Sequence, residues 1–314
     1  MQHRLKQTDD RKENPRQTRP RASRRKKEPT QDVPRERRRP VASDGSRRPA
    51  RAATNIVGLE LRPEEKQLLR ETGRFRVVRT ADLRESLYHG KSGSLDNDLR
   101  YLRDKGLIET SRANLRRDGR RRSIERVEVV TLTKEGRRLL IQDGDLPKDQ
   151  KVYAGLVKPR EVEHDSQIYR AYQKEAERIE GKGGSNLRVR LDYEIKADVQ
   201  KAIYRERKAD PARGMAEIKE QVARQFDLPF VDGGIQIPDA RIEYDLPRDP
   251  VLDVDQGTRT GHEDIEVLTA AYHAGHLRSK AQAGFRNYAS ASDRATITAR
   301  IEDDSHLMEN ILEL

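Results

Sequence analysis

The chain has 314 residues, of which 38% are charged and only 33% hydrophobic, and its formal net charge is +11. This length suits one large or two ordinary domains, but the low apolar fraction indicates that part of the chain does not fold. The absence of cysteine excludes disulfides, thiolate zinc sites and a cysteine nucleophile. No stretch has the length and apolarity of a membrane span, and the first residues lack the apolar core of a signal peptide. We therefore expect a cytoplasmic protein with no membrane partner.

Residues 1–52 carry the excess positive charge. They hold 18 Lys and Arg against 7 Asp and Glu, with prolines between the arginine clusters and almost no large apolar residue. Nothing in this segment offsets the entropy lost on ordering, so we expect a disordered basic arm. Such an arm gains affinity for nucleic acid by releasing counterions from phosphates. A purely solubilising tail is the alternative.

Residues 57–141 have the element order of a winged helix-turn-helix domain. Pro63 opens a first helix, Thr80 is expected to cap a second, and Ser94 a third. A hairpin with a basic tip and one more helix, capped by Thr133, follow. In such domains the third helix enters the major groove of double-stranded DNA while the wing meets flanking phosphates. Some of these domains bind proteins instead, but the basic wing favours DNA.

The residues expected to contact DNA fall on two surfaces. Those on the third helix are Ser94, Asn97, Arg100, Tyr101 and Arg103. Those on the wing are Arg116, Arg117, Arg120, Arg121 and Arg122. We expect the helix to set sequence preference and the wing to supply affinity that depends on salt.

Residues 142–160 are expected to be a linker, since they carry glycine and prolines but few large apolar residues. Residues 161–290 then mix helical and strand patterns, which predicts an α/β domain within an overall α+β chain. The elements expected after the linker are a helix at 162–179, a strand at 187–195, a helical insertion at about 196–226, a hairpin at 235–255, a helix at 263–276 and a C-terminal helix within 291–314.

Carboxylates stand out on the predicted strands. Asp239, Asp253 and Asp255 lie on the hairpin, and Glu194 ends the strand before it. Burying carboxylates in an apolar strand pair is costly unless they bind a cation or share a proton. Without cysteine, a metal site would use oxygen or histidine ligands, which suits Mg²⁺ or Mn²⁺. Alternatively, Asp253 and Asp255 only hydrogen-bond the turn that follows them.

The order of a helix, a strand with Glu194, Pro238-Asp239 and then Asp253-x-Asp255 resembles the restriction-endonuclease-like PD-(D/E)XK nucleases. The resemblance implies that carboxylates at strand ends hold a divalent ion and that a lysine orients the attacking water. It makes Asp239, Asp253 and Glu194 the expected metal ligands. Asp255 stands where these nucleases have lysine, and Lys280 on a later helix is the candidate for that role. These five residues are the expected catalytic set.

With the preceding winged helix, the chain resembles the replication-relaxation family, which is associated with plasmid replication and DNA relaxation and is related to plasmid mobilisation relaxases. The matching residues are His164-Asp165, Glu194, Pro238-Asp239 and the run from Asp253 to Thr258. The resemblance implies a DNA-binding protein of a mobile genetic element that acts in replication, relaxation or mobilisation, with metal-dependent DNA nicking.

Two functions stay open from the sequence. The first is the nicking protein, for which a relaxase mechanism would need a tyrosine nucleophile; Tyr272 and Tyr288 are the candidates, although core packing suits Tyr272 better. The second is a non-enzymatic regulator of replication or transcription that needs no metal, with the nuclease-like domain as a platform for dimerisation or for a partner. Double-stranded DNA, a second copy of the chain, and mobilisation or replication proteins are the partners that these hypotheses allow.

Overall fold

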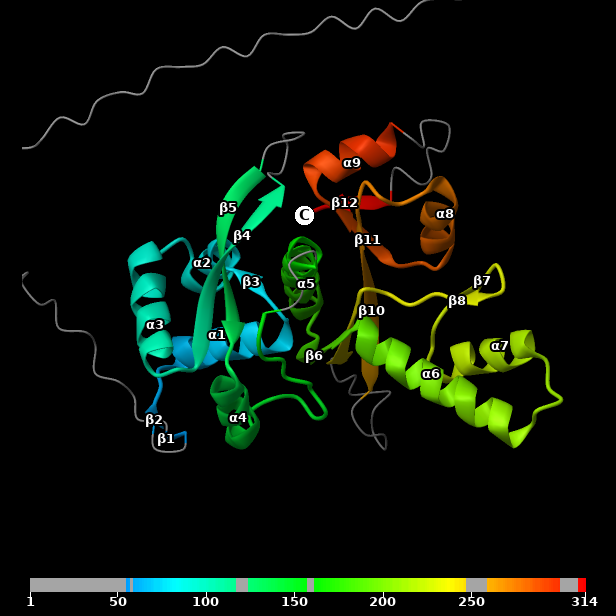
Figure 1. Ribbon diagram of the computed structural model, residues 1–314, viewed down its shortest axis with the longest axis horizontal. Helices are drawn as coiled ribbons and strands as arrows, with labels where there is room; N and C mark the ends of the chain where they lie inside the picture. Colours follow the sequence, from blue (N-terminus) through cyan, green and yellow to red (C-terminus); the bar gives the residue numbers. More distant parts are fainter. Residues whose placement is uncertain (1–54, 57–58, 117–123, 157–160, 247–258, 300–309) are drawn as a thin grey trace, which may run out of the picture. The chain divides into compact units, whose positions relative to one another are not determined.

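The computed structural model describes 55–56, 59–116, 124–156, 161–246, 259–299 and 310–314. The described residues belong to a compact unit that extends from Ala50 to Leu314, and they form a mixed α+β fold (Figure 1). The predicted basic arm at 1–52 lies outside them. No helix in the described ranges is long and apolar enough to cross a membrane.

The first half of this unit contains the predicted sequence of helices and a hairpin. Its helices are α1 (Pro63–Arg74), α2 (Thr80–Tyr88), α3 (Ser92–Asp104) and α4 (Lys134–Asp143). Its strands are β1 (Asn55–Ile56), β2 (Leu59–Glu60), β3 (Val78–Arg79), β4 (Ile108–Arg116) and β5 (Ile124–Leu132), the last three forming a sheet in the order β3-β5-β4. Leucines of α1 and α3 are fully buried against this sheet.

Local capping signals located two of the helices well. Pro63 is the first residue of α1, and the Thr133 hydroxyl accepts a hydrogen bond from the Gly136 backbone N–H at 3.0 Å at the start of α4. The predicted cap at Ser94 is wrong, because α3 begins two residues earlier, at Ser92. Ser94 therefore lies in the first turn of α3, where it is exposed.

The second half is built on a five-stranded sheet in the order β12-β11-β10-β9-β6. The strands are β6 (Ser185–Leu191), β9 (Ala240–Asp245), β10 (Thr260–Leu268), β11 (Arg286–Ala289) and β12 (Ile311–Glu313). Strand β9 runs antiparallel to both β6 and β10, whereas β10, β11 and β12 run parallel to one another. The helices and the small hairpin are α5 (Val162–Gly181), α6 (Asp192–Ala209), α7 (Met215–Gln225), β7 (Phe230–Val231), β8 (Gly234–Ile235), α8 (Ala274–Gln282) and α9 (Ala291–Thr298).

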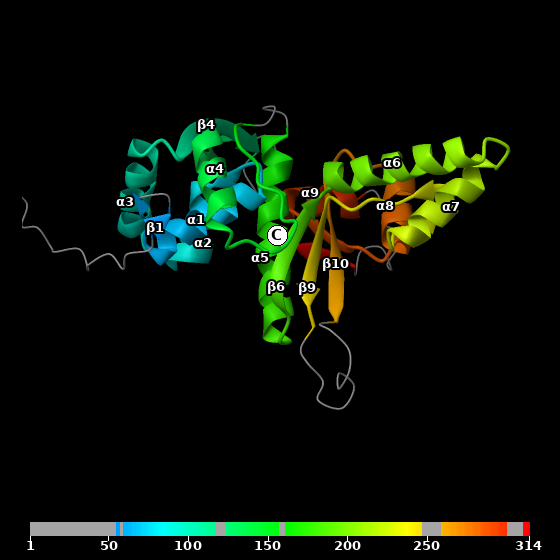
Figure 2. The same cartoon turned by 90° about the horizontal axis from the view of Figure 1, so that it is seen from below.

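Helix α5 packs along the sheet and supplies much of its core (Figure 2). Ile168, Tyr172 and Ile179 recur on one side of the helix and are buried in the same cluster as Val189 of β6 and Ile265 of β10. The predicted helix at 162–179 is therefore present as α5, and these residues form its packed face.

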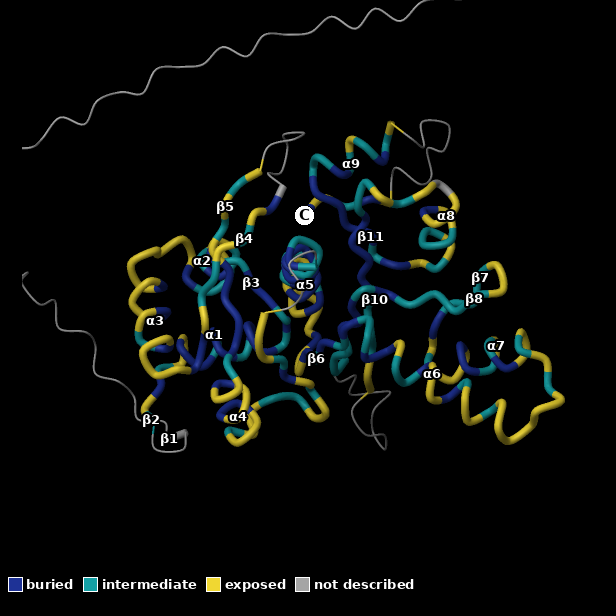
Figure 3. Tube along the Cα trace, viewed as in Figure 1, coloured by how far each residue is buried: buried dark blue, intermediate teal, exposed yellow. Residues whose placement is uncertain are grey.

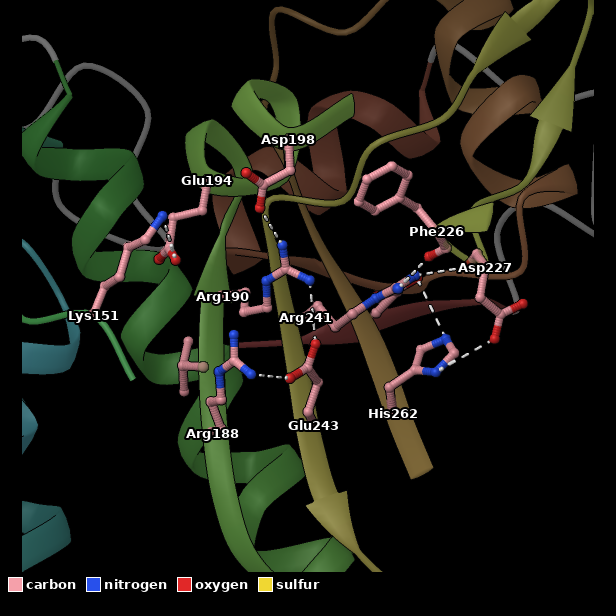
Figure 4. Close-up of polar contacts among 12 residues, drawn as sticks. Lys151, Arg188, Arg190, Glu194, Asp198, Phe226, Asp227, Arg241, Glu243 and His262 are labelled. Atoms are coloured by element: carbon pink, nitrogen blue, oxygen red, sulfur yellow. Dashed lines mark hydrogen bonds and ion pairs between the residues drawn. The ribbon is translucent and has the colours of Figure 1, made fainter. Parts of the chain in front are cut away.

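The insertion formed by α6 and α7 is attached to the strands by polar contacts (Figure 4). Arg190 of β6 pairs with Asp198 of α6 at 2.8 Å. Arg241 of β9 donates to the backbone oxygens of Phe226 and Asp227, just after α7, at 2.7 Å each. Beyond these attachments much of the outer surface of α6 and α7 is exposed (Figure 3).

Three predictions for the second half are wrong. The strand expected at 187–195 ends at Leu191, and α6 begins at Asp192. The helix expected at 263–276 is strand β10 as far as Leu268, followed by α8 from Ala274. Residues 311–313, expected in a C-terminal helix, form β12. In the second and third cases an apolar run fitted both a helical and a strand period, and pairing with a distant strand decided the outcome.

The predicted hairpin at 235–255 is also revised. Gly234–Ile235 pairs with Phe230–Val231, not with the main sheet, and β9 begins only at Ala240. The strand that pairs with β9 on its far side from β6 is β10. Residues 251–255, expected to supply that strand, lie outside the described residues.

Candidate functional site

Asp239 occupies the point where α5, β9 and β10 meet. It follows Pro238 directly before β9, and its backbone oxygen accepts from the Asp192 N–H at 2.9 Å. Its Oδ2 accepts from the Val267 N–H at 2.8 Å and lies 3.2 Å from His164 Nε2. Burial favours the neutral acid, but the hydrogen bond and charge of His164 hold the pKa of Asp239 below its ordinary value. Asp239 is therefore a carboxylate at neutral pH.

Glu266 lies on the neighbouring strand β10 and is only 1% exposed. Its Oε1 accepts from the Tyr272 hydroxyl at 2.7 Å and pairs with Lys280 Nζ at 2.9 Å. Its Oε2 is buried and has no hydrogen-bond partner among the described residues. Burial, and then the nearby charge of Asp239, raise the pKa of Glu266 to about 7. A buried carboxyl oxygen without a partner needs a physical explanation, and an absent ligand is one.

Lys280 of α8 contacts both β10 and the residues that precede β9. Besides pairing with Glu266, its ammonium donates to the backbone oxygen of Ile237 at 2.8 Å, two residues before Asp239. The amine is largely buried. Of the expected catalytic residues, Lys280 is the one that the structure brings to the Asp239 strand end.

His164, in the first turn of α5, supplies the second positive charge. Its Nδ1 lies 3.9 Å from Asp165, and its Nε2 faces Asp239. Burial alone would lower its pKa, but the two carboxylates outweigh that effect and raise the pKa of His164 to about 10. His164 is therefore protonated at neutral pH.

We call Asp239, Glu266, Lys280 and His164 the acidic site. Asp239 and Glu266 offer the hard oxygen donors that Mg²⁺ and Mn²⁺ prefer, and the unpartnered Glu266 Oε2 is a donor not otherwise used. No group of three His, Cys, Asp or Glu in the described part of the chain is arranged to hold a metal. These residues fit an ion held by two carboxylates that takes its other ligands from water or substrate, as Mg²⁺ commonly does.

Glu194, an expected metal ligand, is placed otherwise. It is the third residue of α6, and its Oε1 accepts from the Leu191 N–H at 3.2 Å and from the Tyr153 hydroxyl. Lys151 Nζ lies 3.4 Å from its Oε2 (Figure 4). These contacts are those of a helix cap, and the structure does not bring Glu194 into hydrogen-bond contact with Asp239 or Glu266. Asp253 and Asp255 lie outside the described residues.

Sequence reasoning missed Glu266. Ile265, Leu268 and Tyr272 fall at helical spacing, which puts Glu266 on the polar face of the expected helix. The signal that could have located it is the alternation of Ile265, Glu266 and Val267, with a β-branched residue on either side of the acid.

The residues expected to read DNA lie on one helix. Asn97, Arg100 and Arg103 of α3 are exposed, like Ser94, while Tyr101 is half-buried and donates to the Glu60 backbone oxygen at 3.4 Å. In the hairpin expected to be the wing, β4 ends at Arg116, whose side chain is not described. Arg117, Arg120, Arg121 and Arg122 lie outside the described residues.

The opposite side of α3 is anchored. Asp98 is buried there and accepts from the Tyr88 hydroxyl at 2.9 Å and from Arg62. These contacts fix the helix so that its polar residues face outward.

Comparison with protein-family models, curated proteins and solved structures finds no match for this chain. Function is therefore inferred from the residues and their geometry.

Proposed function

We propose that this chain binds double-stranded DNA through a winged helix-turn-helix domain and nicks one strand, in a metal-dependent reaction, at the acidic site. One observation carries the proposal: Asp239 and Glu266 are largely buried at adjacent antiparallel strands, with Lys280 bonded to Glu266. Such a protein would serve replication, relaxation or mobilisation of a mobile genetic element, as the resemblance to the replication-relaxation family implies.

The order of elements supports a restriction-endonuclease-like core. Helix α5, strands β6, β9 and β10, helix α8 and strand β11 come in this order, with α6, α7 and the β7–β8 hairpin inserted between β6 and β9. The four strands are neighbours in the sheet. Pro238-Asp239 precedes the second of these strands, and Glu266 lies on the third. Leu268 takes the place of the PD-(D/E)XK lysine two residues after Glu266, and Lys280 reaches the same carboxylate from α8.

The expected chemistry follows from these positions. A divalent ion held by Asp239 and Glu266 would lower the pKa of a bound water and neutralise charge on the scissile phosphate. Lys280 presents an ammonium beside Glu266, where it can orient a water or bind a phosphate oxygen. His164 keeps Asp239 ionised and fixes the orientation of its carboxylate.

The DNA-binding part of the proposal is supported by the order of α1, α2, α3, the β4–β5 hairpin and α4. Helix α3 presents Asn97 and Arg100 outward, and these side chain types bond bidentately to adenine and guanine edges. We expect that changing either residue alters sequence preference.

A plasmid nicking assay with Mg²⁺ or Mn²⁺ tests the function. We expect the wild-type chain to relax supercoiled plasmid and Asp239→Asn to lose at least about 1,000-fold of the rate, since it removes one of the two metal-binding carboxylates. Asp245→Asn, at the other end of β9, is the matched control and should nick normally. Equal rates for all three proteins would exclude catalysis at this site.

A non-enzymatic platform is the second candidate. The observation that favours it is that His164 and Lys280 already balance the charges of the two carboxylates without a metal. Calorimetric titration of the full chain with Mn²⁺ separates the candidates. Binding that disappears in Asp239→Asn supports the nuclease, and absence of binding supports a platform for a second copy or another protein.

A further inference from the structure

A groove beside α4 is lined by cations, aromatic rings and aliphatic side chains, and no carboxylate lines it among the described residues. We call it the α4 groove; its volume is about 730 Å³. Its lining includes Lys134, Arg137 and Ile141 of α4, and Tyr153 and Leu156 of the segment 150–156. Pockets of this size hold ligands of several hundred daltons.

One wall of the groove is the segment 150–156, which joins the two halves of the unit (Figure 1). The Tyr153 N–H donates to the Gly73 oxygen, and the Gly155 N–H to the Leu132 oxygen, both at 2.8 Å. The Gln150 side chain donates to the Val189 oxygen at 2.9 Å and accepts from the Val189 N–H at 2.8 Å. The wall is therefore fixed on both sides, and a ligand would meet a preformed surface.

The charge of the groove is positive. Lys134 and Arg137 are exposed on α4, and the structure shows no ion-pair partner for either among the described residues. Arg138, on the next position of α4, does pair with a carboxylate, that of Glu135. Arg76 and Lys151 add two further cations, which pair with acids that do not line the groove: Arg76 with Glu161 and Asp165, and Lys151 with Glu194. A polyanion is the partner that such a lining complements.

The apolar part of the groove distinguishes between kinds of polyanion. Ile141 is 55% exposed and Leu156 48%, which is unusual for large aliphatic residues, and both line the groove. Tyr153 and Tyr193 pack edge to face beside them, with ring centroids 5.3 Å apart. The bases of a duplex are already stacked on each other, whereas unpaired bases gain by packing on such side chains. The lining therefore suits a single strand.

A chain of side-chain and backbone contacts connects the groove to the acidic site. The Arg76 guanidinium stacks at 4.0 Å over the Tyr193 ring and lies 3.7 Å from Asp165, the neighbour of His164. Tyr193 follows Asp192, whose N–H bonds the Asp239 oxygen. Asp165 and Asp192 thus link lining residues of the groove to His164 and Asp239 of the acidic site.

We propose that the α4 groove binds a single DNA strand next to the acidic site, with Lys134 and Arg137 contacting phosphates and Ile141, Leu156 and Tyr153 contacting bases. The proposal rests on the proposed function for the choice of DNA as the nucleic acid and for the nick beside which the strand lies. The strand would be the one separated from its complement near the nick.

Fluorescence anisotropy with a labelled single-stranded 15-mer and the full chain in EDTA tests the groove without cleavage. We expect Lys134→Ala/Arg137→Ala to bind about 10-fold more weakly and to lower the slope of log affinity against log salt by about 1.4, the value for two lost phosphate contacts on a single strand. The matched control is Arg138→Ala/Lys148→Ala, which removes two exposed cations that do not line the groove. It should bind like wild type.

A second variant distinguishes contacts to the bases from contacts to the phosphates. Ile141→Ser/Leu156→Ser changes two exposed side chains and should weaken binding of the single strand with an unchanged salt slope, while binding of a duplex of the same length stays constant. Equal losses for the groove variant and its control would overturn the proposal, as would an equal loss of duplex binding. Asp239→Asn should bind the strand normally, so failure of nicking and failure of the groove are told apart.

Discussion

Glu175 and Glu266 are both glutamates buried against the same sheet, yet their pKa values shift in opposite directions. Glu175, on α5, has both oxygens in use: Oε1 accepts from Tyr288 at 2.6 Å and Arg286 at 2.8 Å, and Oε2 accepts from Arg178 at 2.6 Å. Burial opposes its charge, but these donors hold the pKa of Glu175 below its ordinary value. Glu266 pairs with one cation, Lys280, and its Oε2 has no partner among the described residues. Burial and the nearby charge of Asp239 raise the pKa of Glu266 to about 7.

The difference shows that burial alone does not mark a functional acid. Donors fully surround Glu175, so its charge stabilises the fold and it has no capacity to bind a ligand. Glu266 Oε2 has no donor among the described residues, so this carboxylate can still accept a ligand, and a cation would be favoured there. Changing one member of this pair at a time, and measuring both stability and nicking, separates the two roles.

The largest effect is expected on catalysis. Glu266→Gln should lower the nicking rate by about 1,000-fold, or about 4 kcal/mol of activation free energy, because a carboxylate donor is lost. The free energy of unfolding of the variant should differ from that of wild type by less than about 1 kcal/mol, since the mutation also removes a poorly compensated buried charge. Quantitative plasmid nicking and thermal unfolding measure the two effects. Nicking at the wild-type rate would contradict the assignment of Glu266.

At Glu175 we expect a loss of stability and no change in the nicking rate. Glu175→Gln removes the counter-charge that Arg178 and Arg286 share. Because these arginines are 28% and 39% exposed and Arg178 keeps its ion pair with Glu263, the free energy of unfolding should fall by about 1–2 kcal/mol. The nicking rate per folded molecule should stay as it is in wild type. A chemical denaturation curve gives the first quantity. Unchanged stability would show that the cluster contributes nothing to the fold.

The pH dependence of the unfolding free energy also tests the role of Glu175. Because the pKa of Glu175 is lowered on folding, its contribution is present above the unfolded pKa of about 4.5 and is lost as the pH falls through the folded pKa. The difference in unfolding free energy between wild type and Glu175→Gln should therefore be largest near pH 7 and shrink below about pH 4.5. A difference that grows in acid would refute stabilisation of the Glu175 charge by its three donors.

The smallest effect is expected at Tyr272, whose hydroxyl bonds Glu266. Tyr272→Phe should lose one hydrogen bond, worth about 1 kcal/mol of unfolding free energy, and should keep nicking within about 10-fold of wild type. Complete loss of nicking, with the stability intact, would instead identify Tyr272 as the nucleophile of a relaxase.

The parts of the fold that local chemistry decides were predictable from sequence. Pro63 and Thr133 mark helix starts because their effects act within one turn, and the Pro238-Asp239 pair pointed to a carboxylate that the acidic site contains. Strand β10 was not predictable, because Ile265 to Leu268 becomes extended only through pairing with β9 and β11, which come from elsewhere in the chain. Because β10 was not predicted, Glu266 was not recognised as a strand residue. Glu194 was predicted to end a strand because the alternating pattern of β6 continues into the first turn of α6.

The side chain of Gln150 has a consequence for association. Strand β6 is an edge of the five-stranded sheet, and an open edge invites pairing with a strand of another molecule. By taking both the N–H and the C=O of Val189, the amide of Gln150 imitates one residue of an additional strand and closes the edge at that point. A strand of another molecule that paired with β6 would first have to displace this glutamine from Val189.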